Sequence, residues 1–127
     1  MNLQELEDYI NTNYTKLYEE CKGFCREGEI GGTLRLEELR LYEGCEYCMI
    51  KTAIDHLNTP TLVIPLKDGR VMELAKLGSH ILELSEESAQ VHSTEDFLEE
   101  LKDYLDFGML TAEEATLISK WLSKEKV

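Results

Sequence analysis

Residues 61–74 read Thr61-Leu62-Val63-Ile64-Pro65-Leu66-Lys67-Asp68-Gly69-Arg70-Val71-Met72-Glu73-Leu74, two apolar runs on either side of a short polar stretch. Asp-Gly between alternating apolar residues is the strongest short-range signal for a β-hairpin. Pro65 has no N–H to donate, which predicts that the first strand lies at a sheet edge or at a bulge. The stretch therefore predicts an antiparallel hairpin at the centre of the fold.

The flanking sequence extends this hairpin into a sheet. Residues 80–84 and 90–92 read as a third strand and a short fourth strand. Residues 33–42 alternate apolar and polar side chains with a slip in phase at Glu37-Glu38, which indicates a bulge or a turn. Residues 44–58 fit either a helix or a buried strand, and their length and spacing favour the helix. We expect a central antiparallel or mixed sheet of about 4–6 strands.

Helical patterns stand at both ends of the chain. Apolar residues spaced by three and four from Leu3 to Phe24 predict one long N-terminal helix over residues 2–27. Ser93 or Thr94 can cap a helix that Gly108 ends, and Thr111 with Glu114 forms a capping box for a last helix. The sequence thus predicts an α+β fold with two C-terminal helices, in a single domain over residues 1–127.

The charge of the chain is strongly one-sided. There are 26 acidic and 13 basic residues among 127, a formal net charge of −13. Such a field repels nucleic acid and anionic lipid, and it attracts a basic protein surface. The start of the chain lacks the basic and apolar regions of a signal peptide, and its apolar runs are too short to span a bilayer. We expect a cytoplasmic protein with no direct nucleic-acid or membrane partner, as a monomer or homodimer.

Acidic residues are densest just before and within the first C-terminal helix. Several of them repeat every three or four residues, which predicts a row along the side opposite the apolar stripe of Phe97, Leu98, Leu101, Tyr104 and Leu105. A solvated face of an acidic protein is the plain alternative. The predicted partner-binding residues are Glu86, Glu87, Glu95, Asp96, Glu99, Glu100, Asp103 and Asp106.

The four cysteines form two pairs, Cys21 with Cys25 and Cys45 with Cys48. Their spacing is compatible with a zinc site, the only cofactor that the sequence suggests. The alternative is that Cys21 packs as a small apolar residue on a helix stripe and that no cofactor binds. In a reducing compartment we expect free thiols and no disulfide.

No catalytic arrangement is evident in the chain. Cys45-Glu46-Tyr47-Cys48 suggests thiol chemistry, but the proline stretch at Thr59-Pro60 follows too soon for a thioredoxin-like fold. His56, His80 and His92 are scattered and lack a metalloprotease or triad frame. We expect a protein that is not an enzyme.

An early helix that ends in an aromatic residue and paired glycines is followed by extended segments, a hairpin, a strand and an acidic-aromatic helix. The segments are Tyr18, Phe24, Gly31-Gly32, Thr33–Leu41, Leu62–Leu74, Ile81–Leu84, Gln90–His92 and Phe97–Leu101. From about residue 17 to 104 this order resembles the SMI1/KNR4 (SUKH) superfamily. The chain lacks the usual Leu-Pro before the second helix, and residues 109–127 extend beyond the expected end.

Many members of that superfamily are bacterial immunity proteins that neutralise a toxin, often a nuclease. The resemblance therefore implies an inhibitor of a basic partner such as a nuclease or a nucleic-acid-binding effector, and the net charge of −13 suits this role. Three alternatives remain: a phage or mobile-element anti-defence inhibitor of the anti-CRISPR or anti-restriction type, a zinc-stabilised interaction module, and a thiol-based enzyme.

Overall fold

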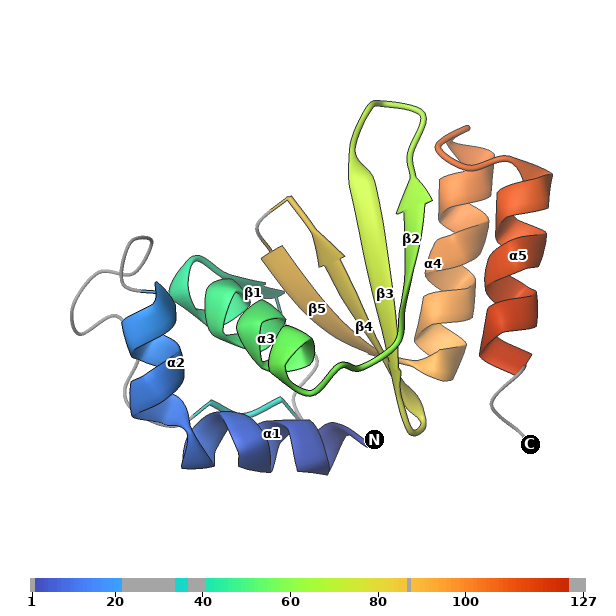
Figure 1. Ribbon diagram of the computed structural model, residues 1–127. Coiled ribbons are helices and arrows are strands. Elements are labelled where there is room, and N and C mark those ends of the chain that lie inside the picture. Colours follow the sequence, from blue (N-terminus) through green and yellow to red (C-terminus); the bar gives the residue numbers. More distant parts are fainter. Residues whose placement is uncertain (1, 22–33, 37–40, 87, 124–127) are drawn as a thin grey trace.

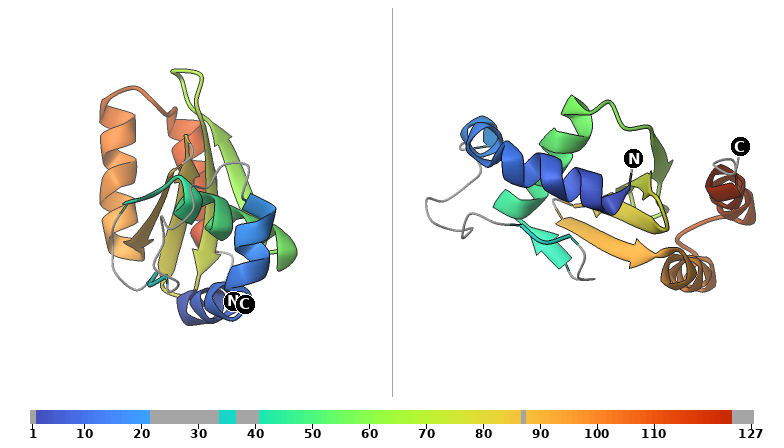
Figure 2. Two further views of the ribbon diagram at one scale, coloured as in Figure 1. Left: turned by 90° about the vertical axis from the view of Figure 1, so that its left-hand side faces the viewer. Right: turned by 90° about the horizontal axis from the view of Figure 1, so that it is seen from below.

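The computed structural model describes residues 2–21, 34–36, 41–86 and 88–123 of the chain. In these residues a five-stranded antiparallel sheet separates two groups of helices (Figures 1 and 2). The α+β architecture and the predicted number of strands are therefore confirmed. The elements in chain order are α1 (Leu3–Thr12), α2 (Tyr14–Cys21), β1 (Leu41–Glu43), α3 (Cys45–His56), β2 (Thr61–Pro65), β3 (Val71–Leu77), β4 (His80–Ser85), β5 (Ser88–Ser93), α4 (Thr94–Asp106) and α5 (Ala112–Ser123).

The sheet grows outward from the predicted hairpin. Its strand order is β1-β5-β4-β3-β2, so β2 is an edge strand, as Pro65 requires. Ile64 pairs with Met72 and Leu62 with Leu74 across the hairpin. The amide of Leu66 donates to Arg70 O over 2.8 Å, and Gly69 closes the turn at a φ of +92°, which disfavours any residue with a β-carbon.

The prediction of one long N-terminal helix is wrong in the described residues. The helical run is divided into α1 and α2 at Asn13, whose side-chain amide donates to Tyr9 O over 2.9 Å. Asparagine competes for backbone partners in this way and is a poor residue in a helix interior. Residues 22–27, the remainder of the predicted helix, lie outside the described residues.

The ambiguous stretch at residues 44–58 forms the helix α3 over Cys45–His56, as the spacing favoured. In the segment predicted as extended at 33–42, residues 34–36 are described and are not a strand, while β1 begins at Leu41. Residues 34–36 are held to α1 by side chains. Asn11 exchanges two hydrogen bonds with the backbone of Leu34, and the Leu36 amide donates to Glu7 Oε2 over 2.6 Å.

The helices cover opposite faces of the sheet. Leu6, Leu17, Ile50, Leu82 and Val91 belong to the core under α1, α2 and α3. The second core lies under α4 and α5, where α4 contacts β4 and β5 and α5 contacts β2. The two predicted C-terminal helices and their caps are confirmed: Ser93 accepts from the Asp96 amide, and Thr111 and Glu114 form the capping box.

Candidate functional site

The acidic row predicted on α4 lies largely on the exposed side of that helix. Glu95, Asp96, Glu99, Asp103 and Asp106 are exposed, and so is Glu86 in the turn before β5. Within the described part of the chain, the carboxylates of the five exposed α4 residues form no ion pair. Glu87 lies outside the described residues.

The apolar stripe predicted to face inward on α4 is only partly buried. Phe97 and Leu101 are buried against the sheet, but Leu98 is 41% and Leu105 36% exposed. These two leucines line a groove of about 860 Å³ between α4 and α5, with Lys102 at its side. The helix is thus rotated relative to the prediction. Leu98 and Leu105 face the groove beside α5, and polar residues of α4, not these leucines, meet strands β4 and β5.

Glu100 is the predicted site residue that turns away from the exposed row. It faces the sheet, where its Oε2 lies 3.3 Å from His92 Nε2 on β5. The same imidazole nitrogen lies 3.0 Å from Glu83 Oε1 on β4. These three side chains, from β4, β5 and α4, form what we call the Glu83 cluster.

The alternation of the strands explains the Glu83 cluster. Ile81 and Glu83 point toward α4, whereas Leu82 and Leu84 point into the opposite core. Ile81 is paired with His92, which brings that imidazole onto the same face, one step from Glu83. Sequence reasoning missed the cluster, although a glutamate between leucines in a buried strand was the available signal.

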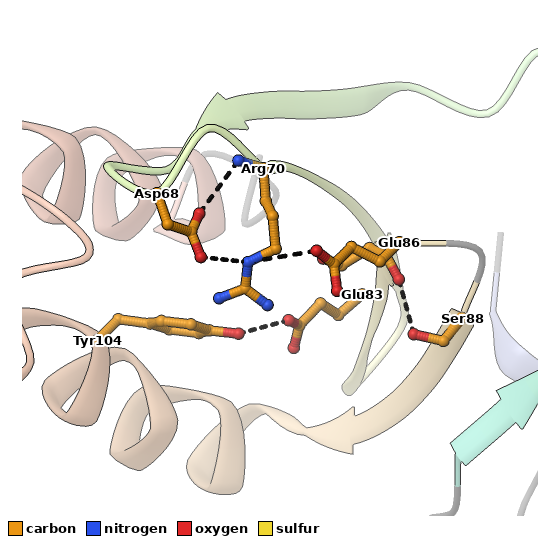
Figure 3. A network of polar contacts seen from close by, with 7 residues as sticks. Asp68, Arg70, Glu83, Glu86, Ser88 and Tyr104 are labelled. Atoms are coloured by element: carbon orange, nitrogen blue, oxygen red, sulfur yellow. Dashed lines mark hydrogen bonds and ion pairs between the residues drawn. The ribbon is translucent and has the colours of Figure 1, made fainter.

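Tyr104 and Arg70 border the Glu83 cluster. Figure 3 shows these two side chains beside Glu83. Tyr104 OH donates to Glu83 Oε2 over 2.8 Å. Arg70 pairs with Asp68, and its Nε lies 3.7 Å from Glu86 Oε1. A recess of about 150 Å³ opens beside these side chains, lined also by Ser85, Ser88 and Gln90.

The Glu83 cluster has an electronegative character. Burial, followed by the nearby charge of Glu83, raises the pKa of Glu100. Burial alone would lower the pKa of His92, but the hydrogen bond to Glu83 and the surrounding carboxylates outweigh it and raise that pKa. Burial and Glu83 also raise the pKa of Tyr104. Two carboxylates therefore compete for one imidazole at the margin of the core.

The predicted cysteine site is only partly described. Cys21 of α2 is buried, as predicted, and it forms a disulfide with Cys48 of α3, their Cα atoms 6.0 Å apart. This differs from the expectation of free thiols, because the apolar stripe of α2 packs on α3 and brings the two sulfurs together. Cys25 and the side chain of Cys45 lie outside the described residues.

The other histidines are not near the Glu83 cluster. His56 on α3 lies 3.0 Å from Glu20 Oε2 and also contacts Tyr9 OH, on the opposite face of the sheet. His80 begins β4 beside Ser79.

No described helix is long and apolar enough to cross a membrane. No protein-family model, no curated protein and no solved structure matches the chain.

Proposed function

We propose that the protein is a non-enzymatic binding protein that covers the cationic surface of a basic partner, such as a nuclease toxin or a nucleic-acid-binding effector. An immunity protein is the form that the SUKH resemblance implies, and an anti-defence inhibitor would use the same physical chemistry. Either form would act where its target acts, in the cytoplasm, where we expect the Cys21–Cys48 pair to be reduced.

The observation that supports the proposal is the exposed row of carboxylates on α4. Glu95, Glu99, Asp103 and Asp106 follow one side of the helix, with no partner cation among the described residues. Neighbours in such a row are roughly 5–6 Å apart and repel one another, so the row does not stabilise the helix. A surface rich in Arg and Lys would turn this repulsion into attraction.

The attraction would act mainly on the rate of encounter. Complementary charges raise association rates above the roughly 10⁵–10⁶ M⁻¹s⁻¹ of neutral partners, and salt screens the effect over about 8–10 Å. A nuclease needs a cationic groove for its phosphates, and a protein of net charge −13 would be drawn to that groove.

The test is capture of the partner from the source cell, at low and at moderate salt, with the double variant Glu99→Lys/Asp103→Lys beside the wild type. We expect the double variant to lose the basic partner while its thermal stability is not reduced, since the reversal also relieves repulsion within the row. With the purified partner, association should slow by at least about tenfold at low salt and dissociation should change little.

The matched control is Asp8→Lys/Asp55→Lys, which reverses the same number of exposed charges on α1 and α3. It should bind nearly as well as the wild type. If the α4 variant binds normally at low salt and the control does not, the partner contacts the opposite side of the molecule and the α4 row is not the binding face.

A further inference from the structure

Three side chains of the Glu83 cluster are arranged as metal ligands. Their nearest ligand atoms all lie within 4.8 Å of one another, with His92 Nε2 at 3.0 Å from Glu83 and 3.3 Å from Glu100. Zinc bound tetrahedrally at about 2.0–2.1 Å separates its ligand atoms by about 3.3 Å. Two of the three edges already have nearly this length, and Glu100, whose side chain is 31% exposed, can adjust the third.

We propose that Glu83, His92 and Glu100 bind a divalent transition-metal cation, with Zn²⁺ as the best fit. The site differs from the cysteine site predicted from sequence and is independent of any protein partner. One imidazole nitrogen and two carboxylate oxygens suit zinc. Calcium and magnesium prefer oxygen ligands throughout, and the cluster offers no thiolate or thioether for a softer ion.

The surroundings of the three ligands support the assignment. Tyr104 OH holds Glu83 through Oε2, which leaves Oε1 directed at His92. Such second-sphere hydrogen bonds fix the orientation of metal-binding carboxylates. The recess of about 150 Å³ beside Glu83 and Glu100 has room for a water as the fourth ligand.

The charge balance of the cluster also favours a dication. Glu83 is only 5% exposed, and a second carboxylate lies beside it. Buried carboxylates are costly unless they are paired, and a single imidazole is shared between these two. A metal ion would neutralise both and would join α4 to strands β4 and β5.

The experiment uses the full chain, stripped of metal with EDTA, and Zn²⁺ alone as the probe. Calorimetric titration and native mass spectrometry should show one equivalent bound at micromolar affinity or better, with a rise in melting temperature. His92→Gln should weaken binding by at least about 100-fold and Glu100→Gln by about 10–100-fold. His56→Gln, which alters a histidine paired with one carboxylate, should leave binding unchanged.

Two results would overturn the proposal. If Zn²⁺ binds more weakly than about 1 mM, the cluster is an ion-pair network only. If His92→Gln and Glu100→Gln both bind as the wild type does, the metal lies elsewhere. Circular dichroism checks the fold of each variant, and Glu100→Gln, at a more exposed side chain than His92, keeps the test valid should His92→Gln not fold.

Cobalt separates this site from a cysteine site. Co²⁺ bound by the Glu83 cluster should show only weak visible bands, and Cys25→Ser/Cys45→Ser should bind it normally. An intense near-ultraviolet thiolate-to-cobalt band that this double variant loses would assign the metal to the cysteines and overturn the proposal.

Discussion

The sheet carries a glutamate on each of its two faces, and the two are neutralised in different ways. Glu73 on β3, toward α3, has its own cation: Lys51 Nζ lies 3.0 Å from Oε1, and Thr61 donates to Oε2. Glu83 on β4, toward α4, shares one imidazole with Glu100. The first arrangement needs nothing further, whereas the second leaves negative charge for a ligand to neutralise.

The helices on the two faces are also attached differently. The Cys21–Cys48 disulfide joins α2 to α3. In the described chain, α4 and α5 are held by side-chain packing and polar contacts, among them the bond from Lys76 Nζ to Leu122 O over 2.6 Å. The face with the exposed carboxylates and the Glu83 cluster is thus the one without a described covalent tie.

The largest effect should come from reducing the disulfide. Its cysteines are 27 residues apart in sequence, and closing a loop of that size stabilises a fold by about 3–4 kcal/mol in the chain-entropy account. Denaturant unfolding with and without dithiothreitol should show this loss, and Cys21→Ala/Cys48→Ala should not respond to the reductant. Unchanged stability on reduction would mean that packing alone joins α2 to α3.

The second effect compares the two glutamates directly. Glu83→Ala removes charge-assisted hydrogen bonds to His92 and Tyr104, and we expect a loss of about 3 kcal/mol. Glu73→Ala should lose only about 1 kcal/mol or less, because its side chain is 22% exposed and water can replace it as a partner of Lys51. Urea unfolding of both variants measures the difference; equal losses would mean that the Glu83 network contributes no more than a surface ion pair.

The two faces also differ in how much of their structure could be predicted from the sequence. The hairpin at 61–74 was predictable because its turn residues and alternation are local signals. The break at Asn13 was missed because a periodic apolar stripe continues across it, although Asn11-Thr12-Asn13 is a run of weak helix formers. Glu83 and His92 meet through the register of β4 and β5, and the turn that joins these strands lacks the Asp-Gly signal of the first hairpin.

The exposure of the acidic residues on α4 was likewise predictable only in part. Their spacing predicted correctly that Glu95, Glu99, Asp103 and Asp106 are exposed. It did not separate Glu100 from them, because the rotation of the helix depends on what the sheet presents to it. Since β4 and β5 present Glu83 and His92, Glu100 turns inward and Leu98 and Leu105 turn toward the groove beside α5.

The smallest effect is a difference in how the two faces respond to pH. Burial alone would raise the pKa of Glu73, but the hydrogen bonds from Thr61 and Lys51 outweigh it and lower that pKa below its usual 4.5. A carboxyl whose pKa is lowered in the fold stabilises the protein above its unfolded pKa, and this contribution is lost as pH falls through the folded pKa. We expect Glu73→Gln to cost under about 1 kcal/mol at neutral pH and almost nothing near pH 3.

Glu100→Gln should show the opposite trend in metal-free protein. Burial and the charge of Glu83 raise the pKa of Glu100, so the folded state holds its proton more tightly than the unfolded chain does. Its ionised form therefore destabilises the fold above the folded pKa, and the penalty fades as pH falls through that pKa. Urea unfolding between pH 7 and about pH 3 should thus show Glu100→Gln more stable than the wild type at neutral pH, with the gap closing in acid. If both variants followed the same trend, the charge balance of the two faces would be alike, and the Glu83 cluster would have no excess of negative charge for a cation to neutralise.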